Sequence, residues 1–447
     1  MLVARRYRWI FPAILSLSLV VSACGGGAEE AEAAPADDSA TTSESVATTE
    51  KATTTTEATT TTVAVEETEE EILANLSSDL EQLVGDWQET NGAPAVSVSV
   101  RLPGQEPINF AGGVTDLVTE EPVATDDYFR IASITKSMTA AVVLQLAGEG
   151  LLELDEPVQT YLPAWLDGYE YADQITIRQL MDHTNGLKEY AFDPEFYTLA
   201  SERLETPIEP EEIIDWLADQ QPLFAPGEQY SYETGGFLSL GRVIEQVTGN
   251  SAAEEMRSRI FEPAGAENIY LTPNEFPPED TVNGYGRELM YFAATGLIGR
   301  EDPDGLTING EPVAAINSLP QELLRSSGWT GGGNEAQVES VSAVFAAMFN
   351  GTILSDEQIE EMTTPALQGS YGLGIDNSEI SGVRVYSHGG GVPGFRSQAG
   401  YLPEHDVAYA LSSTLIPLPA GSDVGDLQTE LVLLLAQAAE ALAEASR

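Results

Sequence analysis

The sequence predicts an α/β (α+β) fold in which one antiparallel sheet is built from both ends of the folded region and is flanked by helices. Alternating apolar patterns typical of strands occur near residue 95 and again after residue 380, whereas the sequence between them is mostly of helical character. A helical pattern also precedes the first strand and another follows the last. We therefore expect a mostly helical subdomain inserted between two groups of strands.

The folded region begins with a helix and two strands. From Glu71 to Trp87 the apolar residues recur at helical spacing, which predicts an amphipathic helix. In residues 95–100 valines alternate with serines, the pattern of a half-buried strand. The turn residues Pro103 and Gly104 then lead to a second strand near residues 108–111.

The end of the chain predicts three more strands and a closing helix. The strands are expected at residues 383–386, 397–401 and 407–411, and the helix at 427–444. Glycine and proline predict turns at residues 389–394 and 403–406. The segment 272–330 gives no clear pattern. Its place before the last strands makes it a candidate wall of a substrate cleft.

Composition excludes several classes of function. The chain has 447 residues and a net charge of −53, from 19 Lys and Arg against 72 Asp and Glu. Such a field repels phosphate backbones, so we expect no nucleic-acid partner. With three histidines and one cysteine, the sequence also lacks the ligand patterns of metal sites, and we expect neither a metal nor another cofactor.

The N-terminus predicts export. Arginines at positions 5, 6 and 8 precede an apolar run that is too short for a mature membrane span, as in a signal peptide over residues 1–23. The residues Val21–Cys24 resemble a bacterial lipobox, which implies a lipid on Cys24. The alternative is an ordinary signal peptide with an unrelated cysteine. We expect a membrane-anchored protein on the extracytoplasmic face.

A tether separates this anchor from the folded domain. Residues 24–71 consist mostly of Ala, Thr, Glu and Gly, and such a segment buries too little apolar surface to offset its ordering entropy. We therefore predict a disordered tether here and a single folded domain over residues 72–447.

Ser133 and Lys136 lie three residues apart in an apolar helical pattern, so both side chains fall on one side of that helix. A serine hydroxyl is a weak nucleophile until a base removes its proton, and burial lowers the pKa of a lysine enough for that role. The chain has only three lysines against sixteen arginines, and burying an unpaired ammonium is costly. A lysine that merely extends to the helix rim is the alternative.

Five blocks in order resemble the penicillin-recognising serine hydrolases, the family of class C β-lactamases, D-alanyl-D-alanine carboxypeptidases and related esterases. The first is FRIASITKSMTAAVVLQLAGEGLLELDEPV from Phe129. The others are ITIRQLMDHTNGL from Ile175, FAPGEQYSYETGGFLSLGRVIEQVTG from Phe224, YGLG from Tyr371 and HGGGVPGF from His388. The resemblance extends over about residues 95–415, and the five blocks are far more specific than Ser-x-x-Lys alone. The resemblance implies a β-lactamase/transpeptidase-like fold.

The resemblance also implies roles for individual residues. Ser133 is the nucleophile, and Lys136 helps to deprotonate it. Tyr232 matches the family's tyrosine, a phenol whose pKa we expect the lysine to lower so that it serves as a base. His388 opens a strand motif that ends in Gly390, where glycine lets the substrate lie against the strand. The backbone N–H groups of Ser133 and Gly391 are the expected oxyanion hole.

One residue departs from the family pattern. Pro226 and Gly227 fix the register, so Thr234 stands where the family has asparagine. An asparagine amide donates and accepts together, whereas threonine offers a single shorter hydroxyl. We therefore expect peptide and β-lactam amides to be held less well than simple esters.

Several alternatives stay open. A membrane-tethered hydrolase that forms an acyl-enzyme on Ser133 fits esterase, D-peptidase, carboxypeptidase and β-lactamase activity, with a small ester, an amide or a peptidoglycan-like substrate. The rival is a catalytically impaired envelope protein that uses the same fold for binding, and Thr234 is its best support. His183 lies in a turn-like segment, and we expect it to hold that turn by hydrogen bonds rather than to take part in catalysis.

Overall fold

The computed structural model describes residues 67–191, 193, 195–196, 206–286, 306–308, 311–318, 321–416 and 424–446. They belong to one unit, Glu66–Arg447. The expected signal peptide, Cys24 and nearly all of the tether lie outside the described residues, so they stay predictions. Within the described part of the chain, no helix combines the length and apolar character needed to cross a membrane.

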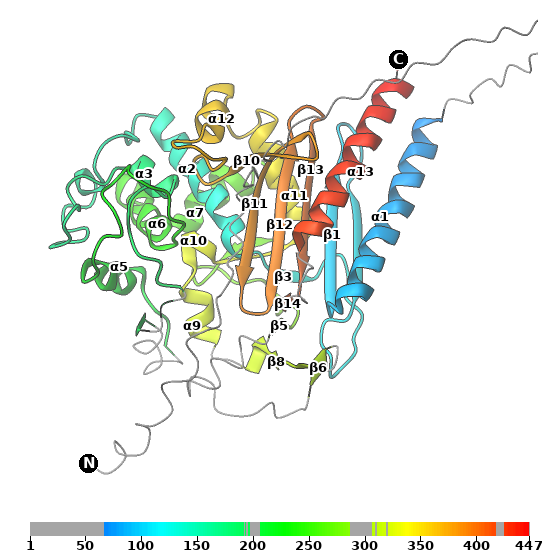
Figure 1. Ribbon diagram of the computed structural model, residues 1–447, viewed down its shortest axis with the longest axis horizontal. Coiled ribbons are helices and arrows are strands. Elements are labelled where there is room, and N and C mark those ends of the chain that lie inside the picture. Colours follow the sequence, from blue (N-terminus) through cyan, green and yellow to red (C-terminus); the bar gives the residue numbers. More distant parts are fainter. Residues whose placement is uncertain are drawn as a thin grey trace, which may run out of the picture. The chain divides into compact units, whose positions relative to one another are not determined.

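A six-stranded antiparallel sheet forms the centre of the molecule (Figure 1). The sheet combines strands from both ends of the folded region, which meet where β13 pairs with β1. In spatial order the strands are β10 (Asp376–Ile380), β11 (Val383–Val392), β12 (Phe395–Leu402), β13 (Val407–Ser413), β1 (Ala95–Arg101) and β2 (Ile108–Gly113). The sheet predicted from both ends of the folded region is thereby confirmed.

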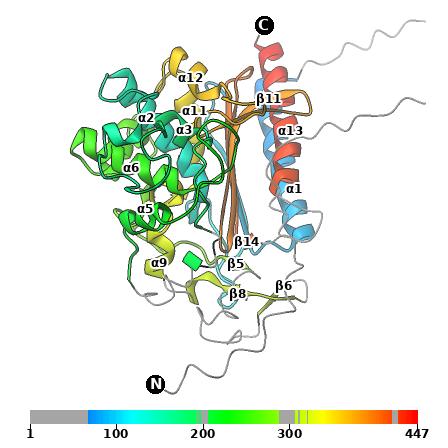
Figure 2. The same cartoon turned by 60° about the vertical axis from the view of Figure 1, so that its left-hand side comes forward.

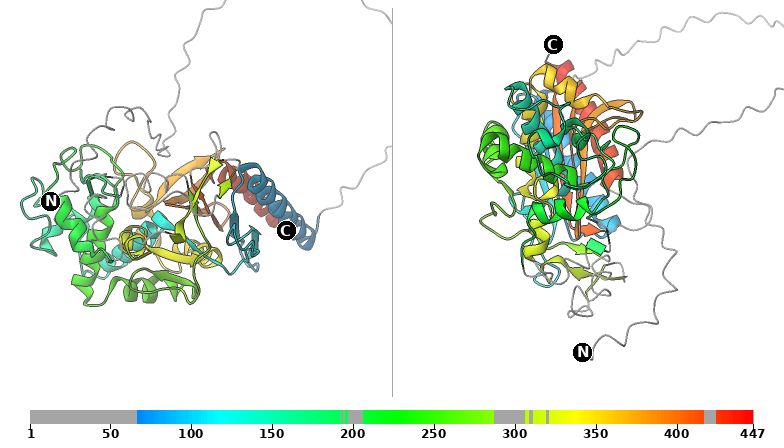
Figure 3. Two further views of the ribbon diagram at one scale, coloured as in Figure 1. Left: turned by 90° about the horizontal axis from the view of Figure 1, so that it is seen from below. Right: turned by 90° about the vertical axis from the view of Figure 1, so that its left-hand side faces the viewer.

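Two terminal helices cover one face of this sheet. Helices α1 (Glu69–Asn91) and α13 (Val424–Ala445) lie side by side there, as the view from below shows (Figure 3). The alternating residues Val98 and Leu411 pack into this layer. Strand alternation therefore sends one set of side chains to the terminal helices and the other set, including Ala399 and Ala410, to the helical part of the molecule.

The helical part covers the opposite face (Figure 2). Its central element, α2 (Thr135–Gly148), is buried at every position from Thr135 to Leu144, as expected for a helix that is apolar all round. The helices around it are α3 (Ile177–Met181), α5 (Pro210–Ala218), α6 (Gly235–Thr248), α7 (Ala252–Met256), α10 (Trp329–Gly332), α11 (Val338–Phe349) and α12 (Asp356–Thr363).

Two expected boundaries are wrong. The first helix begins at Glu69, inside the expected tether, because Thr68 and Glu71 form a capping box. Residues 389–392 are not a turn: Gly389, Gly390 and Gly391 pair with Gln398, Ser397 and Arg396 in β11 and β12. The tight turn is confined to Pro393 and Gly394, and Gly394 has φ 82°.

Short elements lie within and on either side of residues 272–330, the segment whose sequence gives no clear pattern. One three-stranded sheet joins β3 (Tyr128–Arg130), β9 (Asn334–Gln337) and β4 (Ile269–Leu271). Because β3 leads directly into the turn that carries Ser133, this small sheet fixes the approach to α2. The shorter elements are β5 (Tyr285–Gly286), β6 (Thr307–Ile308), β7 (Glu311–Pro312), β8 (Ala314–Ala315), α9 (Gln321–Ser326) and β14 (Leu415–Ile416).

Candidate active site

Ser133 sits in a sharp turn between β3 and α2. A short 3₁₀ turn spans Ala132–Ile134, and Ala132 has φ 52°, a left-handed conformation that is uncommon for residues other than glycine. The Thr135 hydroxyl donates to the Ala132 carbonyl at 2.7 Å and accepts from Asn334 N–H at 3.2 Å. This strained backbone is thus held by its surroundings, a feature that gathers at functional sites.

Lys136 points at the serine from the first turn of α2. Its Nζ lies 3.2 Å from Ser133 Oγ, 2.7 Å from the Gly331 carbonyl oxygen and 3.4 Å from Thr234 Oγ1. Burial lowers the pKa of Lys136 to about 8, although Glu189 and Glu233 oppose that shift. A free amine is therefore accessible near neutral pH. The pair expected from the sequence spacing is in hydrogen-bond contact.

Thr234 has a carboxylate partner that the family motif did not indicate. Its hydroxyl donates to Glu189 Oε2 at 2.9 Å, while Glu189 Oε1 accepts from Ala191 N–H at 2.7 Å. Because that hydroxyl has one proton, Thr234 Oγ1 must accept from Lys136. The neutral amine then donates its two N–H groups to the Gly331 carbonyl and to Thr234 Oγ1, so its lone pair faces the Ser133 hydroxyl.

The two carboxylates near Lys136 are the residues that sequence reasoning missed. Burial raises the pKa of Glu189 to about 7 and also raises the pKa of Glu233. The Glu233 carboxylate accepts from Asn185 Nδ2 at 3.0 Å and from Gly236 N–H at 2.7 Å. Their sequence signal was only that Glu189 lies two residues after one recognised block and Glu233 lies inside another.

Tyr232 faces the same pair but with the opposite electrostatic effect to the one expected. Lys136 Nζ lies over its ring, 4.9 Å from the centroid. Burial raises the pKa of Tyr232 well above its ordinary value, and a hydrogen bond with Ser133 offsets this only in part. The expectation of a lowered pKa for this phenol is therefore wrong, because burial dominates and the nearby acidic groups add to it. The phenol of Tyr232 is neutral at physiological pH.

Tyr371 links the two histidines of the region. Its hydroxyl lies 3.2 Å from His183 Nε2 and 2.8 Å from His388 Nε2. His183 Nδ1 accepts from Glu233 N–H at 3.4 Å, so the proton of this imidazole is on Nε2, which donates to Tyr371. His388 Nδ1 donates to the Gly389 carbonyl at 2.6 Å, so His388 Nε2 accepts from the Tyr371 hydroxyl. The chain of donors runs from Glu233 through His183 and Tyr371 to His388.

Both imidazoles in this chain are neutral. Burial lowers the pKa of His388 to about 3 and that of His183 well below its ordinary value, and the charge of Lys136 adds to both shifts. His183 holds its loop through hydrogen bonds, since its carbonyl also accepts from Ser231 N–H at 3.0 Å. His388 therefore does not place a positive charge beside the nucleophile.

We expect Tyr371→Phe to lower the free energy of unfolding by about 1–3 kcal/mol, because it leaves buried imidazole nitrogens without partners. Denaturant unfolding measures this change. Tyr386→Phe, on the same strand as His388 and with no hydrogen bond to its hydroxyl among the described residues, is the control and should change stability by less than about 0.5 kcal/mol. Equal effects of the two substitutions would contradict the hydrogen-bond chain.

Gly390 brings β11 against the turn that carries the serine. A Cβ at this position would lie 2.1 Å from the Ile131 carbonyl oxygen and 3.3 Å from the Ala132 Cβ. On the opposite face, a Cβ on Gly391 would lie 2.3 Å from Arg396 Nη1. The structure thus places the strand of the expected oxyanion hole next to Ser133, while the roles of Gly390 and Gly391 toward a substrate stay predictions.

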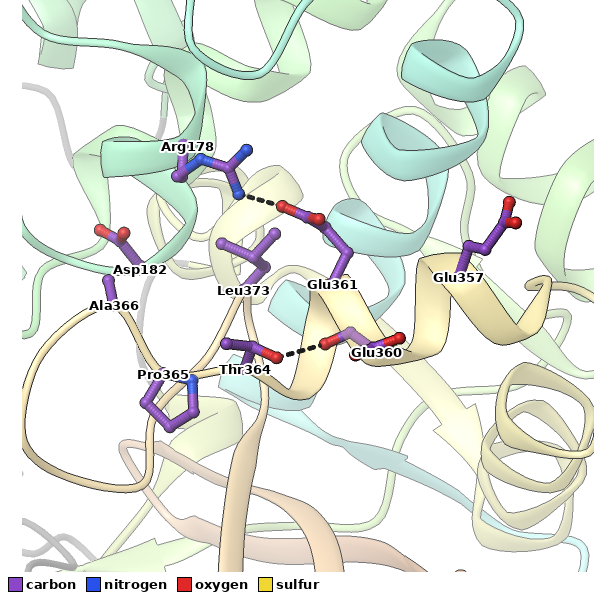
Figure 4. Close-up of a pocket in the computed structure, with 9 residues that line it drawn as sticks. All are labelled: Arg178, Asp182, Glu357, Glu360, Glu361, Thr364, Pro365, Ala366 and Leu373. Carbon is purple, nitrogen blue, oxygen red and sulfur yellow. Dashed lines mark hydrogen bonds and ion pairs between the residues drawn. The ribbon is translucent and has the colours of Figure 1, made fainter.

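A separate concavity of about 390 Å³ lies beside α3 and α12 (Figure 4). None of the expected site residues lines it. Its walls carry Arg178, which is ion-paired with Glu361, and further carboxylates including Asp182. In the described part of the chain, no group of three or more His, Cys, Asp or Glu side chains is arranged to hold a metal ion. The concavity is therefore separate from the Ser133–Lys136 pair.

The fold and the Ser133–Lys136 pair define a serine hydrolase. The comparison with protein-family models identifies which one: the model described as Beta-lactamase matches residues 80–431, and the chain belongs to this family.

Relatives with named activities resemble most of the folded domain. A D-aminopeptidase of Cereibacter sphaeroides strain KD131 is 28% identical over 307 residues, which cover 68% of this chain and 54% of that protein. The chain thus spans about half the length of the curated D-aminopeptidase that it matches.

Solved structures agree with this placement. A D-stereospecific amidohydrolase from Streptomyces sp. matches with TM-score 0.64 and 25% identity, covering 79% of this chain and 97% of that one. The D-amino acid amidase from Ochrobactrum anthropi SV3 matches with TM-score 0.65 and 23% identity, covering 82% and 99%, and supports the fold alone.

Proposed function

We propose that the protein hydrolyses amide bonds on the carboxyl side of D-amino acids, through an acyl-enzyme on Ser133. The observation that carries the proposal is the contact of a buried Lys136 amine with the Ser133 hydroxyl at 3.2 Å. The substrate class is suggested by the activities for which the D-aminopeptidase and the D-stereospecific amidohydrolase are named.

Acylation can be written as a balanced sequence of proton transfers among these groups. Lys136 takes the Ser133 proton as Oγ attacks the carbonyl carbon, and the oxygen becomes an anion that the N–H groups of Ser133 and Gly391 would bind. Tyr232 then gives its O–H proton to the leaving nitrogen and regains one from the Lys136 ammonium. The carbon–nitrogen bond breaks, which leaves an ester on Ser133 and a free amine as the product.

The same groups support deacylation by water. Lys136 removes a proton from the attacking water, the oxygen of which adds to the ester carbonyl carbon. The Ser133–acyl bond breaks, and Oγ takes the proton back. A neutral Tyr232 suits this scheme better than a phenolate, since the phenol must donate in the acylation step.

The direct test compares D-alanine and L-alanine p-nitroanilides as substrates of the wild-type protein and of Ser133→Ala. We expect the wild type to favour the D-enantiomer by at least about a hundredfold in kcat/KM, and Ser133→Ala to lose at least about a thousandfold. A wild-type protein that reacts with a fluorophosphonate but hydrolyses neither anilide would overturn the substrate class and leave the nucleophile in place.

Thr234 bears on the choice between esters and amides. Because its single proton goes to Glu189, it has none to donate to a substrate carbonyl, in keeping with weak binding of β-lactam amides. We expect Thr234→Asn to raise kcat/KM for a chromogenic β-lactam about three- to tenfold, the value of one added hydrogen bond. Thr119→Asn, in an exposed loop, serves as the surface control. Equal changes in both variants would end this explanation.

We also propose that the protein is exported and anchored to the membrane through a lipid on Cys24. The single cysteine of the chain stands directly after the small residues Ser22 and Ala23 and an apolar run. In a bacterial host the wild type should fractionate with membranes and carry a lipid mass, whereas Cys24→Ala should carry none. Intact mass and fractionation measure both outcomes, and an unlipidated wild-type Cys24 would refute the anchor.

A further inference from the structure

Glu189 is connected to Lys136 through a single hydroxyl. The Thr234 hydroxyl lies between them, with its oxygen 2.9 Å from Glu189 Oε2 and 3.4 Å from Lys136 Nζ. An ionised carboxylate can only accept hydrogen bonds, so it takes the one proton of this hydroxyl. The threonine oxygen can then only accept from the amine. No donor is left at that position to compete with Ser133 for the lone pair of the amine.

A backbone group fixes which oxygen of Glu189 faces Thr234. Ala191 N–H donates to Oε1 at 2.7 Å, while Oε2 accepts from Thr234. If an amide replaced this carboxylate, its oxygen would stay opposite the Ala191 N–H and its NH₂ group would face Thr234. The threonine oxygen would then accept from that amide and turn its own proton toward Lys136. The charge of Glu189, and not its shape, therefore decides the direction of both hydrogen bonds of Thr234.

Two carboxylates act on the amine electrostatically, but they differ in their hydrogen bonds. Glu189 and Glu233 both raise the pKa of Lys136, against the larger lowering by burial. Glu233 directs its hydrogen bonds to an asparagine amide and a backbone N–H, whereas Glu189 reaches the hydroxyl that contacts the amine. The other titratable groups around the amine are neutral: Tyr232, His183 and His388. Glu189 thus combines a negative charge with a contact to Thr234.

We propose that Glu189 is a positioning residue for the general base: its carboxylate, acting through the Thr234 hydroxyl, keeps the lone pair of Lys136 directed at Ser133. This inference rests on the proposed acyl-enzyme chemistry and gives Thr234 a role in place of the family's asparagine. A threonine orients the amine in this way only when a carboxylate takes its proton, so Thr234 and Glu189 act as one unit. Replacements of residues that act as a unit have non-additive effects.

The experiment measures the second-order rate constant for labelling of Ser133 by a fluorophosphonate from about pH 6 to about pH 10, a reaction that is independent of the substrate class. The full-length proteins are the wild type, Glu189→Gln, Thr234→Val, Thr234→Ser and the double variant Glu189→Gln/Thr234→Val. Glu156→Gln is the matched control, because Glu156 also accepts from a threonine hydroxyl, that of Thr160, but at 3.4 Å and in an exposed place.

We expect Glu189→Gln to lower the plateau rate at least about tenfold, because the lone pair of the amine is then occupied by the Thr234 proton. The acid limb of the profile should also move to lower pH, since the substitution removes a negative charge that raises the pKa of Lys136. A loss of packing alone would lower the rate without moving the limb. Thr234→Ser keeps the hydroxyl and should stay within about threefold of the wild type, and Glu156→Gln should match the wild-type profile.

The double variant tests whether the two residues act together. Its plateau rate should equal that of Thr234→Val within about threefold, because without the hydroxyl the carboxylate has no route to the amine. A folded Glu189→Gln with the wild-type plateau and limb overturns the proposal. Losses in the two single variants that multiply in the double variant overturn it as well.

A comparison at position 234 covers the case in which circular dichroism shows that Glu189→Gln is unfolded. A rate for Thr234→Val at least about tenfold below that for Thr234→Ser then supports the proposal, and equal rates overturn it. The proposed function fails in a different way. Labelling of the wild type without turnover of either alanine anilide would refute the substrate class, and the comparison of the Glu189 and Thr234 variants would still decide the role of Glu189.

Discussion

Lys136→Met is expected to lower kcat/KM for D-aminoacyl anilides by about 10²- to 10⁴-fold, the range that a positioned general base contributes. Methionine fills a similar volume in the buried position but offers no lone pair to the Ser133 hydroxyl. The matched control is Lys188→Met, because Lys188 is partly exposed and is ion-paired with Asp193 at 2.6 Å. Its activity should stay within about twofold of the wild type.

The pH profile checks the same role without a mutation. Burial lowers the pKa of Lys136 to about 8, and only the free amine can accept the serine proton. The value of kcat/KM should therefore rise with pH to a plateau above about pH 8 and fall about tenfold per unit on the acid side. A profile that is flat between pH 6 and 9, or a Lys136→Met variant with a tenth or more of the activity, would contradict the assignment.

Gly390→Ala is expected to lower the rate of Ser133 acylation by about a hundredfold or more. The added Cβ would lie 2.1 Å from the Ile131 carbonyl oxygen, so either β11 or the turn must move, and both carry parts of the site. A displacement of about 1 Å can cost about 10²-fold in rate. The measurement is the second-order rate constant for labelling by a fluorophosphonate, with circular dichroism to show that the protein is folded.

The control for this substitution is Gly85→Ala in α1, where an added Cβ meets no atom within 4 Å. Its labelling rate should equal that of the wild type. If Gly390→Ala is folded and is labelled as fast as Gly85→Ala, the close approach of β11 to the serine turn does not matter for catalysis.

The fold was predictable because its signals are local. Valine–serine alternation at Val96 to Val100 and the helical spacing up to Trp87 are consequences of which faces are buried. The run of glycines from Gly389 was misread as a turn, since glycine favours turns unless a tertiary contact requires its small size. Here Ile131 on one face and Arg396 on the other provide that requirement.

The sequence predicted contacts in the site only between residues of the same helix or the same motif. Ser133 and Lys136 are one turn apart, so their contact follows from helix geometry. Glu189 reaches Thr234 from a segment 45 residues away, and no single-chain pattern reports such a pairing. That partner also weakens the argument that Thr234 marks a decayed binding protein, because its hydroxyl helps to orient Lys136.

The direction of the Tyr232 pKa shift was also not predictable from the sequence. A buried phenol has a raised pKa unless a strong positive field reaches its hydroxyl. Here Nζ lies over the ring face, 4.9 Å from the centroid, and burial dominates. Proximity was inferable from the motif, whereas depth of burial required the structure.

The proposed chemistry depends on an activated Ser133. The most direct measurement is intact mass after exposure of the purified protein to a fluorophosphonate probe, with Ser133→Ala treated in parallel. We expect a single adduct on the wild type and none on the variant. A folded wild type without an adduct, or an equal adduct on Ser133→Ala, would contradict it.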